Sequence, residues 1–385
     1  MFQFMRRKEA PEVKASATGP VVAYASGGRV AWSPRDVVSL TKQGFAGNPV
    51  GYRCVKLVSE AASALPLVVD GVGGDFAAHP AMDLLARPNL AQGRAELLEG
   101  FYAQLLLAGD GYLEAVGQGD MPSELHVLRS DRMRVVPGAD GWPMAYEYAV
   151  GGRKHRFDAS TGQILHIRNF HPQDDHYGFS PLQAAATAID VHGAASRWSK
   201  ALLDNAARPS GAIVYKSADG HGTLSADQYE RLVGEMEMHH QGARNAGRPM
   251  LLEGGLDWKP MGFSPSDMEF QQTKDSAARE IALAFGVPPM LLGIPGDATY
   301  ANYQEANRAF FRLTVLPLAT RVLANLSGWL SDFAGERLRL RPDLDQVAAL
   351  SSECDAQWQR VMAADFLSDA EKRQMLGLPA EVPHV

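Results

Sequence analysis

Apolar residues recur at helical spacing directly after Asn48, in the stretch NPVGYRCVKLVSEAASALPLVV. Asn48 is a favourable N-cap residue, Pro49 suits the first helical turn, and Pro66 ends the pattern. The positions that share one face are Val50, Cys54, Leu57, Val58, Ala61, Ala62 and Leu65. The pattern predicts a helix with one buried face, followed by a strand in PLVVDG.

Further along the chain the spacing changes from helical to alternating. A second helix is predicted over about 92–108. Its buried stripe is formed by Leu97, Leu98, Phe101, Leu105 and Leu106. Between 110 and 170, turns rich in Gly, Pro and Asp separate short predicted strands in GYLEAVG, ELHVLRSDRMRVVPG, AYEYAV and ILHIRNF. This part of the chain is therefore predicted to be an α+β module.

The tetrapeptide GFSP occurs twice, at 178–181 and at 262–265. In each copy the serine can cap a helix, and the proline after it fits the first turn. The flanking sequences differ, so we interpret the copies as two helix starts, for helices over about 181–206 and 265–285. Small apolar residues line the first helix, whereas the early part of the second is polar on nearly every face.

Residues 208–263 predict a small α/β unit with a strand in GAIVYKS, a helix in SADQYERLVGEMEMHHQG and two strands in RPMLLEGGLDWKPMGF. The stretch FGVPPMLLGIPGDATYANYQEANRAFF then contains three prolines and three glycines, and predicts a loop. A long helix follows over about 301–331, and Pro317 inside it is expected to kink it. Two more helices are predicted, over about 346–364 and, capped by Ser368, in LSDAEKRQMLGLP.

Composition restricts the function without identifying it. The chain has 385 residues, 46% apolar and 21% charged, which suits a soluble protein of a few domains. Its net charge of −7 is unlike that of a tight DNA binder. Two distant cysteines, Cys54 and Cys354, form neither a disulfide framework nor a zinc set. We find no signal-peptide pattern and no apolar run of membrane-spanning length, and therefore expect a cytoplasmic protein.

The most enzyme-like stretch is HIRNFHPQDDHYG. Its potential metal ligands are His166, His171, Asp174, Asp175 and His176. Their spacing matches no standard metal pattern, and Pro172 breaks any helix that could align them, so a polar loop is the simpler interpretation. The chain also contains no P-loop, G-x-S-x-G or H-E-x-x-H motif. We expect no enzyme activity, cofactor or bound metal; a metal-dependent hydrolase that uses His166, His171, Asp174 and His176 is the alternative.

Four stretches together resemble the portal proteins of tailed bacteriophages, of the type common in long-tailed phages and also found in gene transfer agents. They are the Asn-Pro helix start with its ALPL end, GFSPLQAAATAI with NAARPSG, FQQTKDSAAREIALAFGVPPMLLG, and YQEANRAFFRLTVLPL. The resemblance covers most of the chain and implies the α+β portal fold, assembled as a ring. Its parts would be the wing (1–180), the first stem helix (181–207), the clip (208–263), the second stem helix (264–287), the tunnel loop (288–302), a long kinked helix that returns to the wing (303–345) and a small helical crown (346–385).

The resemblance also implies a function and partners. Portal proteins of this family form a twelve-membered ring at one capsid vertex, and DNA passes through its hole. The implied partners are other copies of the chain, double-stranded DNA that passes non-specifically, a terminase motor, a head-completion or adaptor protein and the major capsid protein, with no membrane. The chain would assemble in the host cytoplasm and remain at the portal vertex of the virion.

The charges along the chain agree with a conduit. DNA must slide through it, whereas dense cation contacts would hold the phosphates. The mildly acidic second stem helix is therefore predicted to line the channel with Asp267, Glu269, Gln272, Lys274 and Asp275. The loop after it carries a single charge, and its predicted DNA-facing residues are Ile294, Pro295, Asp297, Thr299, Tyr300 and Asn302.

Contacts between copies are assigned to the first stem helix, because its small residues let a neighbouring helix approach closely. The predicted subunit-packing residues are Ala185, Ile189, Trp198 and Leu202. His192 in the same helix is expected at the surface or at a subunit contact rather than as a catalytic base. A different structural head–tail connector is a second alternative, although connectors are usually much smaller.

Overall fold

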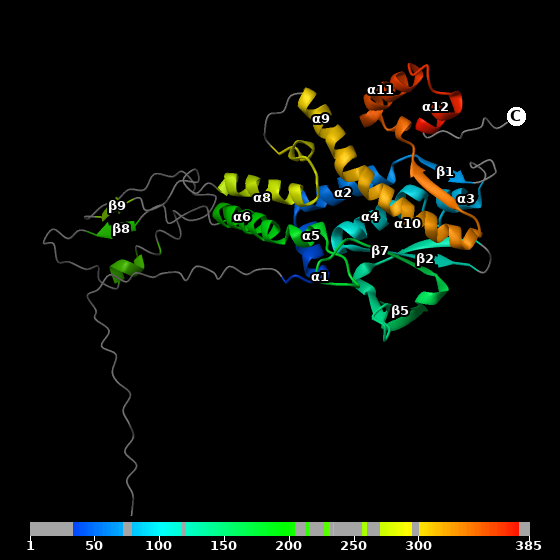
Figure 1. Cartoon of the computed structure of the whole chain (residues 1–385). Coiled ribbons are helices and arrows are strands. Elements are labelled where there is room, and N and C mark those ends of the chain that lie inside the picture. The colour runs from blue at the N-terminus through cyan, green and yellow to red at the C-terminus, as the bar shows by residue number, and fades with distance from the viewer. Residues whose placement is uncertain are drawn as a thin grey trace, which may run out of the picture. The chain divides into compact units, whose positions relative to one another are not determined.

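The computed structural model describes residues 34–71, 79–117, 121–204, 212–215, 227–231, 234, 256–259, 270–294 and 300–376 (Figure 1). Every described residue lies in the unit Ser33–Val385.

The helix predicted after Asn48 is present as α2 (Pro49–Ser63). The Asn48 side chain accepts hydrogen bonds from the backbone N–H groups of Val50 and Gly51, two donors that the first helical turn leaves without a partner. The second predicted helix is α4 (Arg94–Ala108), which packs along α2. Three short helices were not predicted: α1 (Val37–Leu40), the π-helix η1 (Thr41–Ala46) and α3 (Pro80–Ala86).

Antiparallel strands accompany these helices. One sheet has the order β3-β2-β7, formed by β2 (Asp110–Val116), β3 (Glu124–Leu128) and β7 (Ile164–Arg168). A second has the order β4-β5-β6, formed by β4 (Met133–Pro137), β5 (Pro143–Val150) and β6 (Arg153–Asp158). A third pairs β1 (Leu67–Gly71) with β10 (Leu338–Pro342). Two 3-10 turns, η3 (Ser130–Arg132) and η4 (Ala159–Thr161), join strands.

Two of these strands, β6 and β10, were not predicted. β6 is an exposed edge strand with the sequence RKHRFD, in which charged residues hide the alternation of apolar and polar positions. β10 has the sequence LRLRP, and its partner β1 lies far away in the chain. Such pairing over a long sequence separation gives no local signal.

The first stem helix was predicted as one helix, but the structure divides it. α5 (Pro181–Ala184) and α6 (Ala186–Asp204) are separated by a turn at Ala185. Ser180 caps α5 as predicted, because its hydroxyl accepts a hydrogen bond from the Gln183 N–H at 2.9 Å. α8 (Phe270–Ala284) packs along α6, and the two lie side by side in Figure 1. Residues 260–269, with the second GFSP, lie outside the described residues.

The long helix consists of α9 (Tyr300–Phe310), the π-helix η6 (Phe311–Val315) and α10 (Leu316–Ala334), which follow one another without interruption in Figure 1. We predicted a kink at Pro317. In the structure a π-helical turn, which is wider than an α-helical turn, lies just before this proline. Proline cannot donate a hydrogen bond to the carbonyl four residues earlier, and this carbonyl, of Leu313, belongs to the π-helical turn.

The run Ala301–Ala334 is long and apolar enough to span a membrane, which we had not expected. Its apolar face nevertheless lies in the main hydrophobic core of the chain. The fully or nearly fully buried side chains of this face include Val315, Ala319, Val322, Leu323, Leu326 and Leu330, and they join residues of α2 and α4 in one cluster. We therefore interpret the run as the core helix of a folded domain.

The C-terminal region is helical, as predicted. The 3-10 turns η7 (Leu344–Gln346) and η8 (Ala348–Leu350) precede α11 (Ser351–Met362) and α12 (Asp369–Met375). Ser368 and Glu371 form a reciprocal capping box at the start of α12. In the small α/β unit, β8 (Ala212–Tyr215) pairs with β9 (Leu256–Lys259), and helical residues lie at 227–231. The rest of that unit lies outside the described residues.

Candidate functional site

The packed pair of helices α6 and α8 is the first part of the candidate site. α8 turns a face of mainly small residues inward, and the buried positions are Ala277, Ala278, Ile281 and Ala282. Its opposite face and its first half are exposed or half-buried, including Gln272, Lys274 and Asp275. The Gln271 side chain donates to a carboxylate oxygen of Asp275 at 2.9 Å. Asp267 and Glu269 lie outside the described residues.

The first stem helix is anchored to the start of α2. Asn48 Oδ1 caps α2, so its Nδ2 group donates to Nδ1 of His192 at 3.3 Å. His192 is buried, with 4% exposure, and is therefore not the surface residue that we expected. Burial lowers the pKa of His192, and the nearby positive charge of Lys274 lowers it further, so the neutral form is favoured. Arg35 adds an ion pair with the buried Asp190 at 3.8 Å.

The predicted subunit-packing residues have three different outcomes. Ala185 and Ile189 are each 3% exposed, so they already pack inside their own chain. A Cβ atom at Gly44 of η1 would lie 2.8 Å from Cδ1 of Ile189, which shows how closely the two segments approach. Trp198 is 38% exposed and can still contact another copy. The Leu202 side chain lies outside the described residues.

The loop after α8 begins with the 3-10 turn η5 (Pro289–Leu292). Ile294 is half-buried, Tyr300 starts α9, and Asn302 in the first turn of α9 is exposed. The other predicted DNA-facing residues, Pro295, Asp297 and Thr299, lie outside the described residues. The structure therefore describes both ends of the predicted tunnel loop but not its middle.

A short contact joins the chain segments that lead into and out of this loop. The Thr314 hydroxyl of η6 donates to the carbonyl oxygen of Gly286 at 2.6 Å. Gly286 has φ +66°, and a Cβ atom there would lie 2.6 Å from the same hydroxyl oxygen. Only glycine fits this position without strain, so the end of the second stem helix and the π-helical turn are held together.

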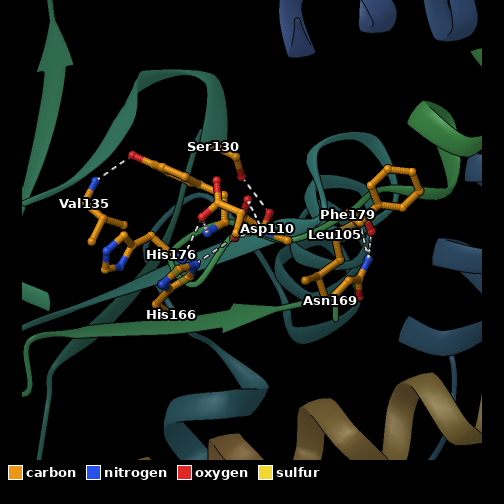
Figure 2. A network of polar contacts seen from close by, with 11 residues as sticks. Leu105, Asp110, Ser130, Val135, His166, Asn169, His176 and Phe179 are labelled. Carbon is orange, nitrogen blue, oxygen red and sulfur yellow. Dashed lines mark hydrogen bonds and ion pairs between the residues drawn. The ribbon is translucent and has the colours of Figure 1, made fainter. Parts of the chain in front are cut away.

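A buried polar network joins the α+β module to the stem (Figure 2). The Asp110 carboxylate is 5% exposed and accepts hydrogen bonds from the Gly178 N–H at 3.0 and 3.1 Å and from Nε2 of His166 at 2.9 Å. The His166 ring stacks on Tyr112, with ring centroids 4.2 Å apart. Because Gly178 lies just before α5, Asp110 fixes the position at which α5 starts.

Asn169 is the second fixed point of this junction. Its side-chain amide donates to the carbonyl oxygens of Leu105 and Phe179, each at 3.2 Å, as Figure 2 shows. Its Oδ1 accepts a hydrogen bond from Arg321 of α10 at 2.6 Å. One side chain therefore connects the end of α4, the start of the stem and the long helix.

Two of the suggested metal ligands, His166 and Asp174, have other roles in this junction. His166 binds Asp110, and Asp174 accepts hydrogen bonds from the backbone N–H groups of His176 and Tyr177 at 2.8 and 3.0 Å. Across the described residues, no group of three or more His, Cys, Asp or Glu side chains is placed to hold a metal ion. The arrangement is that of a structural turn rather than of a hydrolase site.

Sequence reasoning missed Asp110, Asn169 and Arg321, which carry the junction, and Thr314, which binds Gly286 beside the loop. Each acts through a partner far away in the chain, and a single sequence contains no sign of such pairs. The glycines Gly109 and Gly178 are the only sequence signal that could indicate this junction, because glycine permits close backbone contact. A Cβ atom at Gly178 would lie 2.1 Å from the carbonyl oxygen of Gly109.

Comparisons with known proteins identify the family. The family model described as phage portal protein matches residues 49–377. A protein of Rickettsia bellii is 40% identical over 341 residues, which cover 87% of this chain and 88% of that protein. The probable portal protein of Streptomyces phage phiC31 is 28% identical over 309 residues, or 77% of this chain and 66% of that protein.

Among solved structures, a chain from the neck of a native gene transfer agent particle, computed with C12 symmetry, is 68% identical. The match has a TM-score of 0.71 and covers 94% of this chain and 99% of that chain. The chain therefore belongs to the phage portal protein family and has the α+β portal fold. It is a portal protein, and the family match favours this function over the metal-dependent hydrolase.

Proposed function

We propose that twelve copies of this chain form a ring at one vertex of the capsid of a gene transfer agent or phage-like particle, and that double-stranded DNA passes through the ring. The 68% identity to a chain from a neck computed with C12 symmetry carries this proposal. A ring needs one heterologous interface repeated by rotation. The packed pair of helices α6 and α8 has an exposed face, and such a face is needed for an interface between copies or for the wall of a channel.

The parts of the chain divide this work in the proposal. The α+β module up to residue 180 is the wing, α5, α6 and α8 are the stem, and residues 208–263 are the clip. Residues 288–302 form the tunnel loop, and residues 346–385 form the crown. The long helix from α9 to α10 returns from the loop to the wing, as its burial against α2 and α4 supports.

The channel is proposed to let DNA slide instead of gripping it. Along the described first half of α8, Lys274 and Asp275 balance one another, and uncharged residues such as Gln272 and Thr273 are exposed beside them. A wall of this kind offers few fixed cations to the phosphates, so the strong, salt-dependent affinity of a true DNA binder does not arise.

The proposed partners follow from the place of a portal in the particle. The clip is the docking surface for a terminase motor during packaging and for a head-completion protein afterwards, and the wing contacts the major capsid protein. The chain is made in the host cytoplasm and stays in the finished virion.

Electron microscopy of the purified full-length chain tests the proposal. We expect rings with a central hole, and monomers or dimers under all solution conditions would overturn it. Deleting residues 293–300 is expected to leave ring assembly intact while particles fail to package or retain DNA. Loss of assembly in this variant would show that the loop has been misassigned.

A further inference from the structure

Phe170 is 85% exposed, although the residues on both sides of it are fixed. The Asn169 N–H donates to the carbonyl oxygen of Gly109 at 2.8 Å, and its side chain belongs to the junction described above. The His171 ring packs edge-on against Phe179, with ring centroids 5.4 Å apart. The backbone therefore presents the Phe170 ring to solvent from a rigid turn.

Single exposed apolar side chains are ordinary on protein surfaces and need no explanation. Phe170 differs because contacts of Asn169 and His171 hold the backbone on both sides of it. Covering the ring therefore costs little additional entropy from ordering the backbone. Rigid aromatic side chains with this property are common at the centres of protein interfaces.

Arg321 provides a second and independent observation at the same junction. Its guanidinium group is half-buried and donates to Oδ1 of Asn169, the residue next to Phe170. Among the residues that the structure describes, no carboxylate lies within 4.0 Å of this guanidinium group. Desolvation by burial lowers the pKa of Arg321. Within the described part of the chain, this half-buried cation is therefore paired with a neutral amide and not with a counter-charge.

We infer that Phe170 and Arg321 form an anchor that the next copy of the chain covers in the ring, with an acidic side chain of that copy facing the guanidinium group. This inference rests on the proposed ring. The anchor lies at the junction where the stem leaves the wing, and the stems of neighbouring copies must approach each other to enclose a channel. Arginine and aromatic residues are also the types that contribute most to binding at interface centres.

The test compares Phe170→Ser and Arg321→Met with Phe366→Ser in the full-length chain. Phe366 is 88% exposed and lies between α11 and α12, so it is a control matched in residue type and exposure. Mass photometry over a series of protein concentrations measures the ring fraction. We expect both anchor variants to need about tenfold more protein, or still higher concentrations, to form rings, and the control to behave like the unmodified chain.

Thermal unfolding of the dissociated chain separates the anchor from a role within one chain. Arg321→Met removes the hydrogen bond to Asn169, so a lower Tm of the dissociated chain is expected in this variant whether or not Arg321 contacts another copy. The Phe170 side chain makes no hydrogen bond, so the anchor predicts an unchanged Tm of dissociated Phe170→Ser together with impaired ring formation. A Tm of Phe170→Ser that falls together with ring formation would assign Phe170 a role within one chain.

Four further results would overturn the inference. One is that Phe170→Ser forms rings at the same protein concentrations as the unmodified chain. Another is that Phe366→Ser loses ring formation to the same extent, because the effect of Phe170→Ser would then not be specific. Normal rings that fail to enter particles would assign Phe170 to a capsid or adaptor partner instead. Absence of rings from the unmodified chain would overturn the proposed function itself, and the anchor with it.

Discussion

Two helices of equal length, α2 and α8, have 15 residues each and different surroundings. α2 contributes buried residues from Gly51 to Ser63, nearly its whole length. In α8 the buried residues begin at Ala277, and the described side chains before it are exposed or half-buried. A helix with one face buried along its whole length stabilises its own chain, whereas a helix with a polar exposed half offers that half to other molecules.

The largest contrast should come from the core that surrounds α2. Phe101 of α4 is fully buried, so Phe101→Ala leaves a cavity and is expected to destabilise the chain by about 3–5 kcal/mol. Urea unfolding of the dissociated chain measures this loss. Gln272→Ala on the exposed half of α8 is the matched control and should change stability by less than about 0.5 kcal/mol. Similar losses in both variants would remove the distinction between the core around α2 and the exposed half of α8.

The start of α2 should show the next largest effect. Asn48→Ala removes the cap of α2 and the hydrogen bond to His192, and is expected to cost about 2 kcal/mol. Asn48→Asp keeps the capping oxygen, so its loss should be smaller at neutral pH. Equal losses in the two variants would show that the cap contributes little.

Local chemistry explains which parts of the fold could be predicted. Asn48, Ser180 and Ser368 cap helices through residues two or three positions further on, and all three caps were predicted from the sequence. β10 and Arg321 could not be predicted, because each depends on a partner in a distant part of the chain.

The candidate site shows the same limit. The polar character of the second stem helix could be read from its residues, whereas the burial of Ile189 and His192 could not. Both depend on how η1 and the start of α2 pack against the stem, which is a tertiary property. The predicted roles of the loop residues stay predictions.

A moderate, pH-dependent effect is expected at the contact between α2 and the stem. The pKa of His192 is lowered by burial and by Lys274, with Asp275 acting in the opposite direction, and Nδ1 must stay unprotonated to accept from Asn48. The unfolded chain therefore binds a proton more readily. The stability that neutral His192 contributes is fully present above its pKa in the unfolded chain, about 6.5. This contribution is lost as the pH falls through the lower pKa of His192 in the folded chain.

Thermal unfolding between pH 7.5 and pH 5 checks this expectation for the dissociated chain. His192→Gln can still accept a hydrogen bond from Asn48 but does not titrate, so the acid-induced loss in Tm should be smaller in this variant. Identical pH profiles of Tm in the unmodified chain and in His192→Gln would contradict the assignment of the acid-induced loss to His192.

The smallest effect is expected on the surface of α8. Asp275→Asn keeps an oxygen that can accept from Gln271, so stability should change by less than about 0.5 kcal/mol. The same variant removes one negative charge per copy from the proposed channel. Electrophoretic retention of DNA by assembled rings should rise slightly at low salt, and an unchanged retention would argue against a channel position.

The π-helical turn Phe311–Val315 makes the orientation of α9 depend on the number of residues between α9 and α10. Each residue of an α-helix advances the chain by about 100° around the axis. Adding or removing one residue here would rotate α9, and the start of the loop before it, by about that angle while α10 stayed seated in the core. The face that α9 turns toward its surroundings would thus be determined by a single wide turn.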